Sequence, residues 1–414
     1  MKTEFTIIII FSLLLTCSVQ SQWVQDTNGI GHLNSITSMV ISGNNIFAGS
    51  NFCNNGVYLS TNKGLNWIQT SLNNQSVLSL ASNGNNVFAG TAGDGVYLST
   101  NIGSNWTQTS LYNQDVWSLS INGNNIFAAT ANNGVYLSTN NGLSWTQTSL
   151  NNQTVYSISI SGNNIFAGTA SNGVYFSTNN GTSWTQTALN NQNVGALAIN
   201  SNYIFAGTSV NGVYISSNNG LSWTQTSLNN QWVLLLAISG NNVFAGPYLN
   251  GIYLSTNNGT NWLQQNEGFP NLISIESICI INNYVLVGTQ PYGIWRRNLL
   301  ELIGIEKISC NLPTKFMLYQ NYPNPFNPTT KIKFNIPASP VPSKGGGQEV
   351  SIKIYDVLGK EVASLIPPLW GGQEGLSPGT YEVTWDATNY PSGIYFIKLI
   401  MNSYNQTRKM VLLK

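Results

Sequence analysis

The sequence predicts an all-β protein in which a seven-bladed β-propeller precedes a small Ig-like β-sandwich. The first observation is a repeated unit of four short apolar segments, with a spacing of 39 residues between Trp67 and Trp106. The second is that the third segment, Gly-Val-Tyr or a close variant, and the fourth, Trp-x-Gln, each occur seven times. The third is a displaced order, because the chain begins with a fourth segment at Trp23 and the repeats end with a third segment at Gly293.

This displaced order predicts a closed ring. We expect the segment at Trp23 to pair with the segment Gly293–Trp295, because that pairing leaves no free sheet edge at either end of the repeats. A parallel β-helix is the alternative architecture. It requires neither equal numbers of each segment nor a displaced first strand.

Within one unit, the local pattern is that of antiparallel strands. The segments are short, rich in β-branched and aromatic residues, and separated by Asn-Gly or Gly-Asn turns, with no helical period. In the third unit they are Val116–Ile121, Asn125–Thr130, Gly134–Ser138 and Trp145–Ser149. Four strands in a unit of about 40 residues are typical of a propeller blade.

The composition divides the chain into a leader and two domains. Residues 1–21 are predicted to be a signal peptide cleaved near Ser21, since Lys2 precedes an apolar stretch, Ile7–Leu15, that is too short to span a bilayer. Lipidation at Cys17 is the alternative, which Thr directly before the cysteine disfavours. We expect a propeller over residues 22–299, a linker over 300–315, a second domain over 316–414, and no transmembrane span in the mature chain.

Charged side chains are scarce in the predicted ring. Between Gln22 and Leu300 the basic residues are Lys63, Arg296 and Arg297. The acidic residues of this region are Asp26, Asp94, Asp115, Glu267 and Glu276. A surface so poor in positive charge disfavours nucleic acid and anionic lipid as partners.

The cysteines and the single histidine indicate no metal site. Cys53, Cys279 and Cys310 lie at unrelated places and predict neither a disulfide framework nor zinc-ligand spacing, so we expect packing residues or free thiols. His32 is the one histidine, which excludes a His-based triad and a multi-His metal site. We expect no cofactor.

The turn between the third and fourth segments, for example "STNNGLSW", resembles the Asp-box (bacterial neuraminidase, BNR) repeat, Ser-x-Asp-x-Gly-x-x-Trp. In this chain asparagine occupies the aspartate position, at Asn62, Asn101, Asn140, Asn179, Asn218 and Asn257. An Asx side chain can bond to nearby backbone amides, and glycine tolerates the positive φ of such a turn. The resemblance implies a structural role for the six copies, with each tryptophan packing the outer part of a blade.

The second domain resembles the type A C-terminal sorting domain of the type IX secretion system. The resemblance rests on "LYQNYPNPFNPTTKIKFNI", "VSIKIYDVLGKEV", "GTYEVTWDATNYPSGIYFIKL" and a final "RKMVLLK". Alternating segments predict strands at Ser351–Tyr355, Thr380–Trp385 and Ile394–Leu399. The resemblance implies passage through the periplasm, recognition by an outer-membrane translocon, and secretion or surface display. An ordinary Ig-like accessory domain is the alternative.

Variation among the repeats predicts a binding face. The "GNN" and "STNNG" turns hardly vary, whereas the loops between second and third segments, and those that lead into each first segment, differ from copy to copy. We define the second set of loops as the variable face. The candidate ligand-binding residues there are Phe52, Asp94, Asp115, Trp117, Tyr156, Trp232, Tyr248 and Tyr292.

Aromatic faces beside amides and a few carboxylates suit a neutral sugar. The alternative for Trp117 and Tyr156 is that strand alternation places them in the core between blades, with Leu119 and Ile158. Trp232 precedes its strand and is the stronger candidate for the surface.

Three functions remain open on this sequence. The leading hypothesis is a non-catalytic module that binds glycans or proteins. The alternatives are a glycoside hydrolase that uses Asp94 and Asp115, since such enzymes need two carboxylates beside the bond, and a passive surface scaffold. A sialidase is disfavoured, because the ring has only two arginines, adjacent in one strand and therefore on opposite faces.

Overall fold

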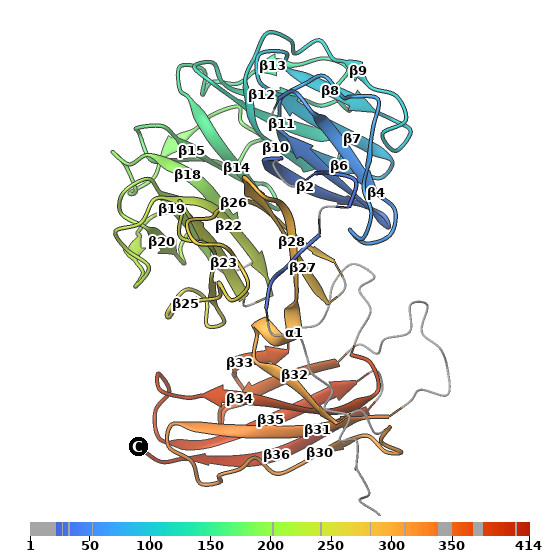
Figure 1. Cartoon of the computed structure of the whole chain (residues 1–414). Coiled ribbons are helices and arrows are strands. Elements are labelled where there is room, and N and C mark those ends of the chain that lie inside the picture. Colours follow the sequence, from blue (N-terminus) through green and yellow to red (C-terminus); the bar gives the residue numbers. More distant parts are fainter. Residues whose placement is uncertain are drawn as a thin grey trace, which may run out of the picture.

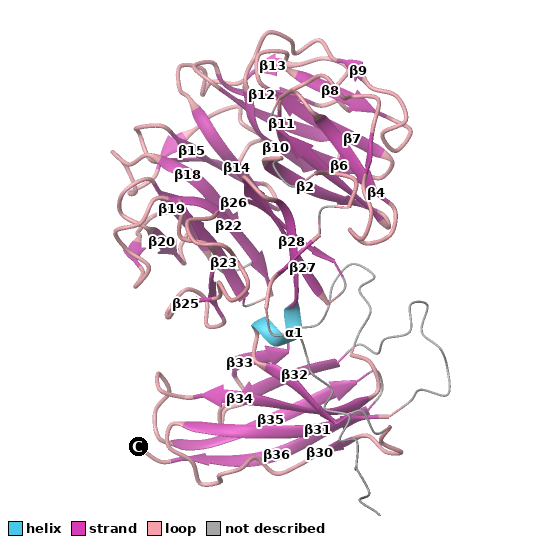
Figure 2. Ribbon diagram, in the orientation of Figure 1, coloured by secondary structure: helices cyan, strands magenta, loops and turns pink. Residues whose placement is uncertain are grey.

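The computed structural model describes residues 22–414 except 27, 32–33, 52, 201–202, 241, 282, 310–311, 338–349, 367–375 and 402–403. The predicted signal peptide, His32, Phe52 and Cys310 therefore lie outside the described residues. In the described part, seven four-stranded sheets form a ring, and two more four-stranded sheets form a separate body at the C-terminal end (Figures 1 and 2).

Each sheet of the ring is one blade, whose strands follow one another from the innermost outward. Blade 1 comprises β2 (Ile36–Ser42), β3 (Asn45–Ser50), β4 (Gly56–Ser60) and β5 (Ile68–Gln69). Blade 2 comprises β6 (Val77–Asn83), β7 (Asn86–Thr91), β8 (Val96–Ser99) and β9 (Thr107–Gln108). Blade 3 comprises β10 (Val116–Asn122), β11 (Asn125–Thr130), β12 (Gly134–Ser138) and β13 (Thr146–Gln147). Blade 4 comprises β14 (Val155–Ser161), β15 (Asn164–Thr169), β16 (Val174–Ser177) and β17 (Thr185–Gln186). Blade 5 comprises β18 (Val194–Ile199), β19 (Ile204–Thr208), β20 (Val213–Ser216) and β21 (Thr224–Gln225). Blade 6 comprises β22 (Val233–Ser239), β23 (Asn242–Pro247), β24 (Tyr253–Ser255) and β25 (Leu263–Gln264).

Blade 7 contains strands from both ends of the ring. It comprises β26 (Ser274–Ile281), β27 (Tyr284–Gln290), β28 (Gly293–Asn298) and the N-terminal β1 (Val24–Gln25). β1 pairs antiparallel with β28, with Val24 opposite Arg296 and Gln25 opposite Trp295. The predicted pairing of the first segment with the last is thus confirmed, and the β-helix alternative is excluded.

Trp23 anchors β1 to the blade. Its side chain is 2% exposed, its indole stacks on Phe269 at a centroid distance of 4.8 Å, and its Nε1 donates to the Gln265 carbonyl oxygen at 2.6 Å. On its other side, blade 7 contacts blade 1: Ser277 Oγ donates to the Ile36 carbonyl oxygen at 2.9 Å. The ring is therefore continuous across its closure.

Adjacent blades pack through residues that recur in every unit. The phenylalanines of the second strands are fully buried between blades, at Phe47, Phe88, Phe127, Phe166, Phe205 and Phe244. Small residues follow them because the next blade approaches closely. A Cβ added at Gly90 would lie 2.6 Å from Val116 Cγ1 of the neighbouring blade. The close approach of the neighbouring blade therefore requires a small residue at this position of the second strand.

The six Asx-containing turns share one hydrogen-bond pattern. The serine Oγ accepts from the glycine backbone N–H at 2.8–2.9 Å. The asparagine Oδ1 accepts from the backbone N–H four residues later at 2.9–3.0 Å. In three of the six turns, the tryptophan indole N–H donates to a threonine of the preceding blade. For example, Trp145 Nε1 donates to Thr109 Oγ1 at 3.2 Å. These turns therefore use their polar groups internally.

The C-terminal body is a sandwich of two antiparallel sheets. One sheet has the order β29 (Ile305–Ser309), β34 (Gly379–Asp386), β31 (Thr329–Ile336) and β30 (Met317–Leu318). The other has the order β33 (Glu361–Ile366), β32 (Val350–Tyr355), β35 (Gly393–Met401) and β36 (Tyr404–Leu412). The three strands that the sequence predicts lie within β32, β34 and β35. Phe334, Ile352 and Leu399 are fully buried in the core between the sheets.

The segment 300–315, predicted as a linker, contains ordered elements of both bodies. The helix α1 (Leu299–Leu302) places Leu299 and Leu302 in the core of blade 7 and Leu300 in the core of the sandwich. β29 follows and pairs with β34. The sandwich thus begins at Ile305 rather than at Phe316. The sequence does not indicate this because β29 forms only through a partner more than 70 residues away, as with Ile305 opposite Val383.

Candidate functional site

The innermost strand of every blade begins with a β-bulge, which inserts one residue that has no partner on the next strand. The register shifts lie between Ile36 and Ser38 in blade 1 and at the equivalent place in the other six. We call the seven inserted residues the bulge ring: Thr37, Leu78, Trp117, Tyr156, Gly195, Leu234 and Glu276. All seven line one cavity of about 300 Å³, which we call the channel mouth.

The residues that follow the bulge ring connect neighbouring blades. Ser79 Oγ donates to the Val116 carbonyl oxygen at 3.0 Å, and Ser157 Oγ accepts from the Leu197 backbone N–H at 3.1 Å. The corresponding residues of blades 5 and 6 are apolar, Ala196 and Leu235. These serine hydroxyls are therefore engaged in blade-to-blade hydrogen bonds around the channel.

Trp117 and Tyr156 meet in the channel mouth. Their ring centroids are 5.7 Å apart and the ring planes are inclined by 83°. The alternative considered for these side chains was that strand alternation places them in the core between blades, with Leu119 and Ile158. That alternative is wrong for Trp117, which is 39% exposed while Leu119 is buried. The bulge interrupts the alternation, so the aromatic side chains line the channel.

Glu276 carries the one formal charge among the described residues that line the channel mouth. Burial raises the pKa of its carboxyl group above the ordinary value. Glu276 is not among the candidate residues that the sequence indicates. Comparison of the first segments in all seven units would have found it, since Glu276 occupies the position equivalent to Trp117 and Tyr156.

Trp232 and Tyr248 form a second aromatic pair, which we call the rim pair. Their ring centroids are 4.9 Å apart, and the side chains are 47% and 45% exposed. The Tyr248 backbone N–H donates to the Trp232 carbonyl oxygen at 2.7 Å, which holds the two loops of blade 6 together. The pair therefore presents an ordered aromatic surface on the variable face.

The remaining candidates lie apart from both aromatic pairs. Asp94 is exposed in the β7–β8 loop, and Asp115 is half-buried before β10; neither side chain lines the channel mouth. Tyr292 packs against the closure core of blade 7, and its carbonyl oxygen accepts from Gln25 Nε2 at 2.7 Å. The structure thus divides the predicted patch rather than gathering it into one site.

The two arginines of the ring form ion pairs near the closure. Arg296 lies 3.5 Å from an Asp26 carboxylate oxygen, and Arg297 lies 2.8 Å from a carboxylate oxygen of Glu267. Burial raises the pKa of Asp26, an effect that the charge of Arg296 partly offsets. Burial alone would raise the pKa of Glu267, but hydrogen bonding and the charge of Arg297 lower it below its ordinary value. Both arginines are thus paired with carboxylates near the closure and do not converge on a ligand carboxylate.

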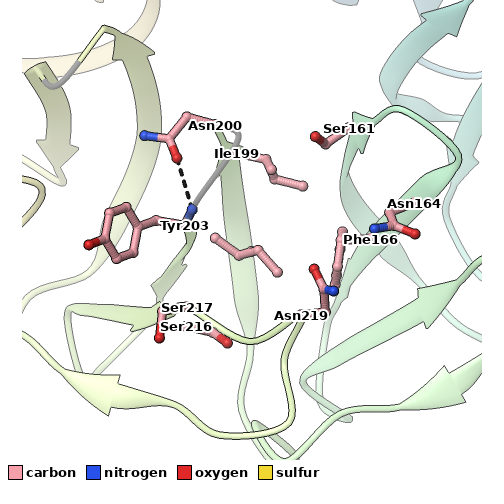
Figure 3. A pocket seen from close by; sticks show the side chains of 10 residues that line it. Ser161, Asn164, Phe166, Ile199, Asn200, Tyr203, Ser216, Ser217 and Asn219 are labelled. Atoms are coloured by element: carbon pink, nitrogen blue, oxygen red, sulfur yellow. Dashed lines mark hydrogen bonds between the residues drawn. The ribbon is translucent and has the colours of Figure 1, made fainter. Parts of the chain in front are cut away.

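A second cavity, of about 420 Å³, lies between blades 4 and 5 at the face that carries the "GNN" and "STNNG" turns (Figure 3). It is lined by polar groups that include Ser161, Asn164 and Asn219. Tyr203 stands where the equivalent unit has Asn164, and its backbone N–H donates to Asn200 Oδ1 at 2.8 Å. None of the candidate residues from the sequence lies in this cavity.

The described cysteines have separate surroundings. Cys279 is buried in the core between blades 7 and 1, and burial raises the pKa of its thiol to about 12, whereas Cys53 is exposed.

Among the residues with described positions, no three His, Cys, Asp or Glu side chains are grouped as metal ligands. No helix in the described part of the chain is long and apolar enough to cross a membrane.

Comparisons with known proteins identify the C-terminal domain. Residues 320–413 match the family model of the secretion system C-terminal sorting domain. A search of curated protein sequences finds no match.

The whole fold is similar to solved structures of propeller proteins. One is PorZ, described as an essential surface component of the type IX secretion system of Porphyromonas gingivalis, with 14% identity, coverage of 92% of this chain and 60% of that chain, and a TM-score of 0.51. Another is YCF48 from Cyanidioschyzon merolae, with 14% identity, coverage of 67% and 98%, and a TM-score of 0.55. A third is a GH74 enzyme from Niastella koreensis, with 14% identity, coverage of 93% and 67%, and a TM-score of 0.51.

Similarity at this level of identity establishes the fold and carries no activity with it. The chain therefore joins an all-β propeller to a secretion system C-terminal sorting domain, and that domain indicates export by the type IX secretion system to the cell surface or the medium.

Proposed function

We propose that the propeller is a non-catalytic binding or adhesion module that recognises glycans or proteins through its variable face. The observation that carries this proposal is the rim pair: two aromatic rings, ordered against each other and nearly half exposed. Exposed aromatic surface of this kind is enriched where proteins bind sugars or other proteins. The sorting domain supports a location outside the cell, where such a module meets its ligands.

The proposed export route has three steps. Residues 1–21 direct the chain to the periplasm and are removed near Ser21. The C-terminal sorting domain, whose family match spans residues 320–413, is then recognised by the outer-membrane translocon. The propeller is the cargo that reaches the surface or the medium.

We also propose that the six turns between third and fourth strands are Asp-box turns with asparagine in the aspartate position. Their shared pattern of hydrogen bonds supports this assignment. Asn140 is representative: its Oδ1 accepts from Ser138 Oγ at 2.9 Å and from the Ser144 backbone N–H at 3.0 Å.

A pair of substitutions tests this assignment. Asn140→Ala should lower the free energy of unfolding by about 1 kcal/mol, because the turn loses its acceptor. Asn140→Asp keeps the acceptor and should lie within about 0.5 kcal/mol of the unaltered protein. Denaturant unfolding of both variants measures the difference. Equal losses for alanine and aspartate would contradict the assignment.

Trp232→Ala tests the binding function. We expect arrays of glycans and of surface proteins to show saturable binding to the full chain, and this substitution to lower the affinity at least about tenfold, as for an interface hot spot. Leu143→Ala is the control, because Leu143 is 75% exposed and belongs to an invariant turn on the opposite face. It should bind as the unaltered protein does.

The other two functions give different outcomes in the same experiment. A glycoside hydrolase would release sugar from the bound glycans, and Asp94→Asn or Asp115→Asn would abolish that turnover. A passive scaffold would show no saturable binding to either array. Either result would overturn the binding proposal.

A further inference from the structure

Glu276 is a charged group without a counter-charge. Its carboxylate lines the channel mouth and has no hydrogen bond or ion pair among the described residues. Tyr156 is the other titratable residue of that lining, which contains neither lysine nor arginine. A carboxylate that is partly removed from water without a partner costs free energy, and a bound cation offsets that cost.

The arrangement of the blades places this carboxylate across the channel from the aromatic pair. In a ring of seven, blade 7 lies opposite blades 3 and 4, which contribute Trp117 and Tyr156 to the same bulge ring. Both aromatic side chains line the channel mouth. A cation between them would therefore have a carboxylate on one side and electron-rich rings on the other, and both kinds of group attract ammonium ions.

The layer beneath the bulge ring limits how deep a charge can enter. The lining there includes Met39, Leu80, Leu119, Leu197, Leu236 and Ile278. A charged head group is unfavourable in that layer, so it stays at the level of Glu276. The volume of about 300 Å³ accommodates one amine with a short aliphatic stem.

We infer that the channel mouth binds a single protonated primary amine on an aliphatic stem, such as the lysine side chain of a partner protein. Glu276 forms the ion pair with the ammonium group, and Trp117 and Tyr156 contact the ammonium group or its stem. This site is distinct from the rim pair and does not depend on the identity of the ligand bound there.

Two probes with the same aliphatic stem, one ending in an ammonium group and one in a neutral amide, test the inference. Nα-acetyl-lysinamide carries the ammonium group, and its Nε-acetylated form has the same stem without the charge. Titration calorimetry on the purified full chain should show binding of the first and at least tenfold weaker binding of the second. Equal binding of the two probes would overturn the inference.

Substitutions locate the site. Glu276→Gln keeps the shape of the side chain and should lower the affinity for the lysine probe at least tenfold. Trp117→Ala should lower it about two- to fivefold, as expected for an exposed cation–π contact. Asp94→Asn removes a carboxylate of the same face outside the channel and should have no effect. Unchanged binding by Glu276→Gln, with the unfolding midpoint preserved, would also overturn the inference.

The pH dependence provides an independent readout. Protonation of Glu276 abolishes the ion pair, so affinity should fall as the pH is lowered through the pKa of this carboxyl group. Because burial raises that pKa, the loss should begin at a higher pH than an ordinary glutamate would give. Trp232→Ala should leave amine binding unchanged, so failure of the rim-pair proposal and failure of the channel proposal are distinguishable.

Discussion

Trp23→Ala is expected to lower the free energy of unfolding by about 3–5 kcal/mol, the usual cost of truncating a large buried aromatic side chain. The substitution removes the stack on Phe269 and the hydrogen bond to the Gln265 carbonyl oxygen. It also releases β1, whose pairing with β28 spans only Val24 and Gln25. Loss of β1 exposes the edge of β28, so this variant should also aggregate more readily.

Denaturant unfolding measures the stability, and two further variants make the result specific. Trp23→Phe keeps an aromatic ring but lacks the indole N–H, so it should retain part of the stability that alanine loses. Trp232→Ala removes the same side chain from an exposed site and should cost less than about 1 kcal/mol. If Trp23→Ala unfolds at the same denaturant concentration as the unaltered protein, closure through β1 does not stabilise the ring.

Removal of the sorting domain is the second change with a large expected effect. A chain that ends at Gly304 should leave the propeller folded in the periplasm and absent from the cell surface, because the domain recognised for export is missing. Fractionation of a host with a type IX secretion system, followed by limited proteolysis of the periplasmic fraction, measures both parts of this prediction.

The position of the truncation follows from the structure. Ending the chain before Phe316 would leave β29 without its partner β34, whereas Gly304 retains Leu299 and Leu302 in the core of blade 7. The full-length Trp232→Ala variant is the control and should reach the surface in normal amounts, since its substitution lies on the propeller. Normal surface delivery of the truncated chain would show that this domain is not the export signal.

The strands were predictable because the repeat supplies many local signals at once. The expected segments Asn125–Thr130 and Gly134–Ser138 coincide with β11 and β12, and turns of asparagine and glycine bound both. The outermost strands were expected to be longer than they are: Trp145–Ser149 reduces to β13, Thr146–Gln147. That strand has one neighbour in its sheet, and only two residues form ladder pairs with it.

The candidate site was less predictable, because a bulge changes which way a side chain points without changing the apolar pattern of the strand. Trp117 was a candidate ligand-binding residue, but its placement in the core with Leu119 stayed open as the alternative, and Glu276 was not among the candidates. The rim pair was partly predictable, since Trp232 precedes its strand. Its contact with Tyr248 depends on the β22–β23 hairpin, which brings the two loops together.

For this protein, the sequence alone was sufficient to derive the four-stranded unit and the closure of the ring by its first strand, because each depends on local pattern or on counting equivalent segments. The sorting domain followed from the resemblance of its sequence to a known family. Only the tertiary structure decided that α1 joins the two cores, that β29 belongs to the sandwich, and that seven bulges turn a carboxylate and two aromatic side chains toward one channel. These features arise from contacts between residues far apart in the chain, and no local preference for strand or turn encodes them.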